Sequence, residues 1–122
     1  MLNCLVTGLG GFIGAVLRYL IGMVPLKETM VFPLKTFIIN IAGCIAIGYI
    51  VILAAKNVSL NPRFVLFFKT GLCGGFTTFS TFALETTDLI RQNHTGIAFL
   101  YALFSIVAGV SVIFLLDILL NK

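Results

Sequence analysis

The chain has 122 residues, of which 60% are hydrophobic and only 10% are charged, and its formal net charge is +4. A soluble domain of this length has too little core to bury so much apolar surface, so the composition excludes a soluble globular protein and identifies an integral membrane protein. The few cations lie near the ends of apolar segments, which suits membrane anchoring and implies no nucleic-acid partner.

Four segments are long and apolar enough to cross a lipid bilayer, which takes about 20 residues. They are predicted at residues 2–24, 34–55, 62–91 and 95–120. The linkers between them are too short for a second domain, so residues 1–122 form one four-helix membrane domain. The expected fold class is therefore an all-α integral membrane protein with four transmembrane helices, the third of them broken.

The first predicted span is rich in small residues, including Gly10 and Gly14, which lie on one face of a helix and let another helix approach closely. The run Gly8–Gly14 superficially resembles a dinucleotide-binding loop, but its spacing is wrong and no strand precedes it. Helix packing is therefore the interpretation. Arg18 is expected to extend its stem toward the membrane interface; the alternative is that it attracts anions to a vestibule.

Asn40 interrupts the second predicted span, between two isoleucines. An amide side chain inside an apolar helix must find a polar partner. Two interpretations stay open at this point. Asn40 either joins two helices by hydrogen bonds or donates its NH2 group to an anion in a pore.

The third predicted span contains the most informative feature, a run from Gly71 to Phe82 that is rich in glycine, threonine and serine. Unpaired backbone groups are costly in hydrocarbon, so a helix that breaks there must line a cavity, bind an ion or be covered by protein. We expect two half-helices, Phe64–Gly74 and Ser80–Arg91, with the break near mid-membrane. Free carbonyls of the first half attract cations, and free N–H groups of the second attract anions.

Phe79 and Phe82 share one face of the second half-helix. Core packing is the default role of such a pair, and the alternative is that the positive edges of their rings face an anion. Hydroxyl groups near the break and on the fourth span either satisfy freed backbone groups or replace water around an ion. These residues are Thr77, Thr78, Ser80, Thr81, Tyr101, Ser105 and Ser111.

Lysine and arginine are evenly divided between the two sides of the membrane. Lys56, Arg63, Lys69 and Lys122 lie on the side of the termini, and Arg18, Lys27, Lys35 and Arg91 lie on the other. Orientation follows an excess of these residues on one side, so a balanced chain can insert both ways and pair as an antiparallel dimer. The alternative is that a single residue, such as Lys69 or Arg18, still decides the orientation.

Together these features resemble the CrcB-type (Fluc) fluoride channels over nearly the whole chain. The residues that carry the resemblance are Gly10–Ala15 with Arg18 and Tyr19, Thr36 with Asn40–Gly43, and above all Gly71–Phe82 with Glu85.

The resemblance implies a dual-topology antiparallel homodimer in the cell inner (plasma) membrane that passively exports fluoride through two pores. Carbonyls of Gly74 and Thr77 from both subunits would hold a structural sodium ion, the only cofactor. Asn40 would donate to fluoride near the pore entrance, and the ring edges of Phe79 and Phe82 would line the pathway. The remaining polar lining would come from Ser80, Thr81, Tyr101 and Ser105.

Two other functions remain open from the residues alone. A small multidrug-type proton-coupled exporter would share the four short spans and the dual topology, but it needs a membrane-buried carboxylate, for which Glu85 is the only candidate. A non-transporting membrane scaffold would explain the glycines and leave the break without a purpose. An enzyme is not expected, because the sequence has no HExxH, no GxSxG and no Cys/His cluster with metal-ligand spacing.

Overall fold

The structure is a computed structural model that describes residues 1–25 and 30–120. Three of its helices are long and apolar enough to cross a membrane, namely α1 (Leu2–Met23), α2 (Leu34–Lys56) and α6 (Thr95–Leu120). They match the first, second and fourth predicted spans to within one residue at each end. Lys27 and Lys122, which entered the charge count, lie outside the described residues.

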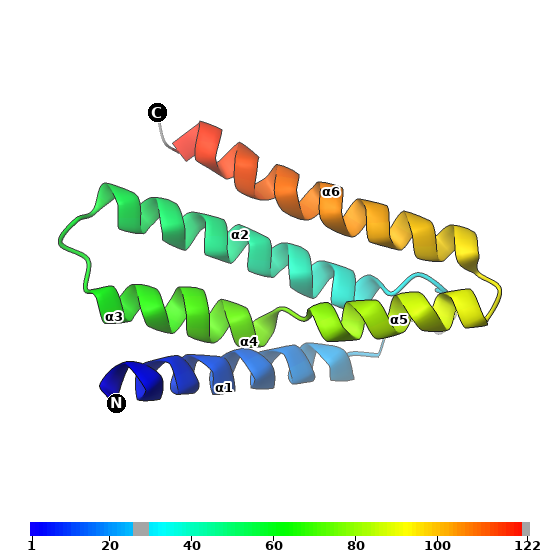
Figure 1. Ribbon diagram of the computed structural model, residues 1–122, viewed down its shortest axis with the longest axis horizontal. Coiled ribbons are helices and arrows are strands. Elements are labelled where there is room, and N and C mark those ends of the chain that lie inside the picture. The colour runs from blue at the N-terminus through cyan, green and yellow to red at the C-terminus, as the bar shows by residue number, and fades with distance from the viewer. Residues whose placement is uncertain (26–29, 121–122) are drawn as a thin grey trace.

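The remaining predicted span is a broken helix over residues 62–91. Its parts are α3 (Pro62–Val65), the π-helix η1 (Leu66–Cys73), α4 (Gly74–Phe76) and α5 (Phe79–Arg91). The broken helix lies between α1 and α2, and α6 lies beyond α2 (Figure 1). The start of α1 and the end of α6 lie at the same end of the structure, as four crossings require.

Side-chain caps explain where the broken helix starts and restarts. Asn61 accepts a hydrogen bond from the N–H of Arg63 at 2.9 Å, and Pro62 occupies the first turn, where no N–H is needed. Thr78 caps α5 in the same way, since its hydroxyl oxygen accepts from the N–H of Thr81 at 3.2 Å. The predicted break is confirmed, and it is confined to the extended residues Thr77 and Thr78.

The predicted end of the second half-helix at Arg91 is confirmed, and the other predicted bounds, including the start at Phe64 instead of Pro62, were wrong by one or two residues. The first half continues past Gly74 to Phe76, and the second begins at Phe79. The hydroxyl of Thr77 donates back to the carbonyl oxygen of Cys73 at 2.9 Å, which holds the last turn of the first half together. The π-helix η1 was not predicted, because its residues carry no local signal for a wider turn.

Glycines bring α1 into backbone contact with the broken helix. A Cβ atom added at Gly10 would collide with the Phe67 carbonyl oxygen, and one at Gly14 with the Leu72 carbonyl oxygen. A Cβ atom at Gly71 would in turn lie 2.7 Å from the carbonyl oxygen of Thr7. The close helix approach expected from the small residues is thus confirmed.

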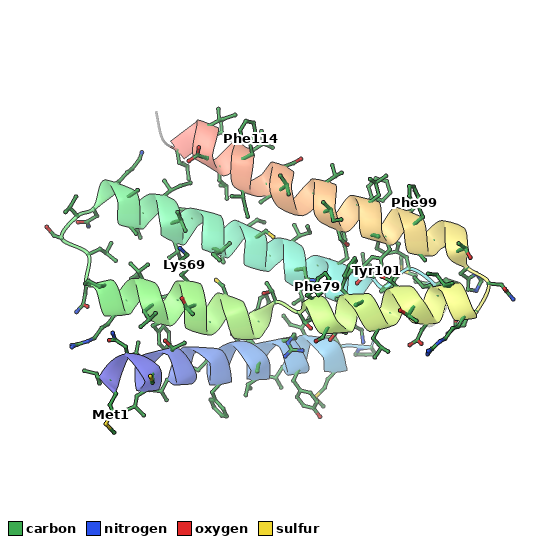
Figure 2. The ribbon with its side chains drawn as sticks, viewed as in Figure 1. Met1, Lys69, Phe79, Phe99, Tyr101 and Phe114 are labelled. Atoms are coloured by element: carbon green, nitrogen blue, oxygen red, sulfur yellow. The ribbon has the colours of Figure 1, made fainter. Side chains whose placement is uncertain are left out.

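Few side chains are buried between the helices. The main cluster joins α5 to α6 through Leu89, Ala98 and the fully buried Tyr101. Large apolar side chains cover the outside instead, and Figure 2 shows Phe99 and Phe114 pointing away from the neighbouring helices on α6. Such an apolar exterior is what a lipid-facing surface requires.

Candidate functional site

Asn40 on α2 holds the break in place. The N–H of Thr78 donates to Asn40 Oδ1 at 2.8 Å, and Asn40 Nδ2 donates to the carbonyl oxygen of Thr78 at 3.2 Å. The side chain therefore joins α2 to the broken helix, which is one of the two roles considered for it. An amide nitrogen carries two hydrogens, and Thr78 uses one of them.

These side-chain bonds leave two carbonyl groups without their helical partners. In an α-helix each carbonyl accepts from the N–H one turn further along, so Gly74 would pair with Thr78 and Thr77 with Thr81. The N–H of Thr78 instead donates to Asn40, and the N–H of Thr81 donates to the hydroxyl of Thr78. The break therefore frees the carbonyl oxygens of Gly74 and Thr77.

Arg18 donates a hydrogen bond to the carbonyl oxygen of Gly75, which lies between Gly74 and Thr77 in the sequence. The donor is its Nε, at 3.2 Å from the oxygen, and the side chain is half-buried. The expectation that Arg18 extends to the membrane interface is therefore wrong. In the apolar interior a carbonyl that has lost its helical donor needs another one, and a guanidinium supplies a strong charge-assisted bond.

An open groove of about 650 Å³, here called the central groove, lies beside the break and is bounded by α2, the broken helix and α6. Its wall is mostly apolar and includes the rings of Phe79 and Phe82. Its polar and charged lining residues are Asn40, Lys69, Thr70, Thr77, Thr78 and Ser105. Gly74 also lines it, so residues of the break face the same space as the aromatic pair.

The two phenylalanines of the groove differ in their surroundings. Their ring centroids are 5.7 Å apart with an interplanar angle of 41°. Phe82 also lies against Tyr101 of α6, with ring centroids 5.0 Å apart. Phe79 is 79% exposed within a single chain. The Phe79 side of the groove is therefore open.

Ser105 of α6 lines the central groove and carries an unsatisfied hydroxyl. Its Oγ is buried, and within residues 1–25 and 30–120 no hydrogen-bond partner lies in reach. A buried hydroxyl without a partner is destabilising by about 1–3 kcal/mol. Such an atom indicates a position where water or a ligand completes the hydrogen bonding.

A second pocket of about 560 Å³, the Arg18 pocket, lies between α1, α2 and α5. Its charged residues are Arg18, Lys35 and Glu85. Thr78 lines both this pocket and the central groove. The break therefore forms part of the wall between the two cavities.

Glu85 is held by hydroxyl groups from two other helices. Thr36 Oγ1 donates to Glu85 Oε1 at 2.7 Å, and the Tyr101 hydroxyl donates to Glu85 Oε2 at 2.8 Å. The sequence marked this carboxylate as the candidate for a proton-coupled exporter and did not predict its partners. They come from α2 and α6, and only the tertiary structure brings those helices to Glu85.

The structure brings only part of the predicted polar lining together. Asn40, Phe79, Phe82 and Ser105 meet in the central groove with Gly74 and Thr77. Thr81 lines the Arg18 pocket, the Tyr101 hydroxyl is engaged by Glu85, and Ser80 is exposed with its Oγ 3.3 Å from the Thr78 hydroxyl. Sequence reasoning missed the position of Lys69 in the groove, although a lysine inside an apolar span is itself a signal.

Comparison with known proteins assigns the family. Residues 5–116 match the family described as CrcB-like protein, Camphor Resistance (CrcB). A Chlorobaculum tepidum protein named Fluoride-specific ion channel FluC is 44% identical over 115 residues, covering 93% of this chain and 90% of that protein.

Two further relatives carry the same name. The protein from Azobacteroides pseudotrichonymphae is 41% identical over 109 residues, covering 88% of this chain and 87% of its own. The protein from Flavobacterium psychrophilum is 45% identical over 102 residues, covering 83% and 82%. The matched region includes the break and both cavities. The chain is thus a multi-pass membrane protein and belongs to the CrcB-like family.

Proposed function

We propose that this chain is a fluoride channel of the plasma membrane that lets fluoride leave the cell passively. The relatives are named as fluoride-specific ion channels and not as enzymes, which supports this function. The observation that carries the proposal is the unpartnered, buried hydroxyl of Ser105, which shares one groove with Asn40 and with the rings of Phe79 and Phe82.

The donors of the groove suit a small, strongly hydrated anion. Fluoride must exchange its water for close hydrogen-bond donors, and each donor must be weak enough to release it. Ser105 offers its O–H, Asn40 offers the hydrogen that Thr78 does not use, and Phe79 and Phe82 offer their positive ring edges. Past the break, Thr81 continues the path into the Arg18 pocket, which it lines.

The working unit of the proposal is an antiparallel homodimer with two pores. The open groove and the exposed Phe79 leave room for a second copy to complete the site. The cation balance also supports insertion in both orientations. Arg18 and Lys69 lie in the two cavities and not at helix ends. Of the other described cations, two lie at each end of the structure, Lys56 and Arg63 at one end and Lys35 and Arg91 at the other.

A structural sodium ion fits the freed carbonyls of Gly74 and Thr77. Both residues line the open groove, and a two-fold axis would double the two oxygens to four. Carbonyl oxygens are the ligands that replace the water of an alkali cation in channels. When bound, the ion supplies a central positive charge, which lowers the cost of bringing anions into the membrane.

Neither rival function gains from the geometry. A proton-coupled exporter needs an available carboxylate, but both oxygens of Glu85 accept hydroxyl bonds. The described lining of the central groove contains a lysine and no carboxylate. A scaffold would have no use for the unpartnered hydroxyl of Ser105.

The test is fluoride efflux from liposomes that contain the purified protein, followed with a fluoride electrode beside a chloride control. Rapid efflux of fluoride without chloride, in the absence of a proton gradient, is the expected result. Well-folded protein that releases no fluoride would overturn the proposal.

A further inference from the structure

Lys69 places a positive charge in the same groove as the proposed fluoride donors. It belongs to η1 and lines the central groove beside Thr70. Figure 2 shows its side chain between the broken helix and α2. It lies about two turns inside the start of the broken helix at Pro62, which corresponds to at most about 10 Å along the axis.

No carboxylate stands beside Lys69 in the described lining of the central groove. Over the described parts of the chain, the only ion pair that the geometry shows joins Arg91 to Asp88 at the far end of α5, so Lys69 is not part of one. An unpaired charge inside a membrane span is expensive and typically marks an ion pathway. The lysine therefore calls for a partner that the single chain does not supply.

The π-helix aligns Lys69 with the break. A wider turn places residues four or five apart on one face, and Lys69 of η1 lies four residues before Cys73 and five before Gly74 of α4, which line the groove with it. One face of η1 and α4 thus leads from the ammonium group to the break and Phe79. An anion that passes Lys69 remains in the same groove until it reaches Asn40 and Ser105.

We propose that Lys69 attracts anions at the mouth of the central groove and raises the local fluoride concentration in front of Asn40 and Ser105. This inference rests on the proposed channel function and adds a residue to it. A charge in a cleft with low-dielectric walls focuses the field and raises local ion concentration by tenfold or more. Arginine would serve as well, because the role requires a charge and not a particular hydrogen-bond geometry.

The test compares fluoride flux through Lys69→Gln, Lys69→Arg and Lys56→Gln over a range of fluoride concentrations. Lys56 ends α2, is exposed, and lies at the same end of the structure. Lys56→Gln therefore makes the same change in net charge at the same end of the structure, outside the groove. We expect Lys69→Gln to raise the half-saturating fluoride concentration about tenfold, and Lys69→Arg and Lys56→Gln to leave it unchanged.

Ionic strength provides a second arm. The difference between wild type and Lys69→Gln should shrink when an impermeant salt is added, since salt screens charges that are reached by water. An unchanged concentration dependence in Lys69→Gln, or an equal shift in Lys56→Gln, would overturn the inference.

A thiol-labelling arm separates this inference from the channel function. Cys44 also lines the groove and is half-buried, so it can report the local field in a background in which Cys4 and Cys73 are replaced by serine. Lys69→Gln should reduce the labelling rate of an anionic sulfonate thiol reagent relative to a cationic ammonium reagent about tenfold. If the wild type passes no fluoride but Lys69→Gln changes the labelling ratio, the channel function is refuted and the effect of Lys69 on anions in the groove is supported. If the wild type passes fluoride but the labelling ratio is unchanged, the channel function is supported and the effect of Lys69 is refuted.

Discussion

Asn40 and Thr78 are joined by two hydrogen bonds, so a single amide side chain serves both backbone polar groups of a residue in the middle of a membrane helix. The Asn40 amide makes the hydrogen bonds to Thr78 that the backbone of a continuous helix would otherwise make. By taking the N–H of Thr78 it also frees the carbonyl of Gly74. The same contact therefore stabilises the break and frees one of the two carbonyl oxygens that we propose as sodium ligands.

Asn40→Leu and Asn40→Asp should separate these two roles. Leucine leaves both polar groups of Thr78 unpaired, which is destabilising by about 1–3 kcal/mol for each group, so the melting temperature in detergent should fall. Aspartate keeps the acceptor for the Thr78 N–H but loses the donor and adds a negative charge. We expect Asn40→Asp to be the more stable of the two and to conduct no fluoride. A fully active Asn40→Asp would exclude Asn40 as a donor to fluoride.

Gly14→Ala should be strongly destabilising. Its Cβ would overlap the carbonyl oxygen of Leu72 and lie 2.7 Å from the backbone nitrogen of Phe76, and backbone atoms cannot move aside singly. Overpacking of this kind is destabilising by about 1–3 kcal/mol. Gly8→Ala on the same helix is the matched control, because its Cβ meets nothing within 4 Å. Thermal unfolding in detergent measures both, and equal melting temperatures would argue against this helix contact.

The sequence predicted those features of the fold that depend on residue type along the chain. Apolar length located α1, α2 and α6, and the glycine and threonine run located the break. It did not predict the contact of Arg18 with Gly75, because only the packing of α1 against the broken helix brings the guanidinium to that carbonyl. The position of Glu85 between Thr36 and Tyr101 likewise depends on three helices that are distant in sequence.

Most of the predicted residues that meet in the central groove come from one segment. Gly74, Thr77, Phe79 and Phe82 are close in sequence, and they reach the same groove. Tyr101 could not be placed this way. The apolar pattern of α6 gives no indication of which side faces α5, and the hydroxyl points to Glu85. A hydroxyl in a membrane span can form its hydrogen bond with any of several partners, and the packing between helices determines which partner it meets.

Glu85→Gln tests the proton-coupled rival. Glutamine has nearly the same shape and can still accept from Thr36, while its NH2 group can donate to the Tyr101 hydroxyl oxygen, which reverses that bond. We therefore expect a folded protein whose fluoride efflux persists without a proton gradient. Efflux with and without an imposed pH difference measures this. Complete loss of transport, with wild-type transport driven by protons, would favour the exporter.

Phe79→Ile and Phe82→Ile should affect function alike and stability differently. Both changes remove a ring edge from the central groove, so we expect both variants to lose most fluoride flux. Phe79 is exposed within one chain, whereas Phe82 lies against Tyr101, and such aromatic pairs contribute about 0.5–1.5 kcal/mol. Phe82→Ile should lower the melting temperature of the monomeric chain in detergent more than Phe79→Ile, because Phe82 has two aromatic neighbours and Phe79 has one of these contacts. Normal flux in both variants would remove the aromatic pathway from the proposal.

Ser105→Ala should raise stability and reduce function in the same molecule. The wild-type hydroxyl is buried without a partner in the described chain, so its removal relieves a desolvation cost of about 1–3 kcal/mol and should raise the melting temperature. The same change removes a donor from the groove, and fluoride flux should fall. Cys is the matched control, because Ser105→Cys keeps the size of the side chain but has only a weak S–H donor. It should conduct less than wild type without a packing defect. A merely structural serine predicts the opposite result, a less stable Ser105→Ala protein with unchanged fluoride flux.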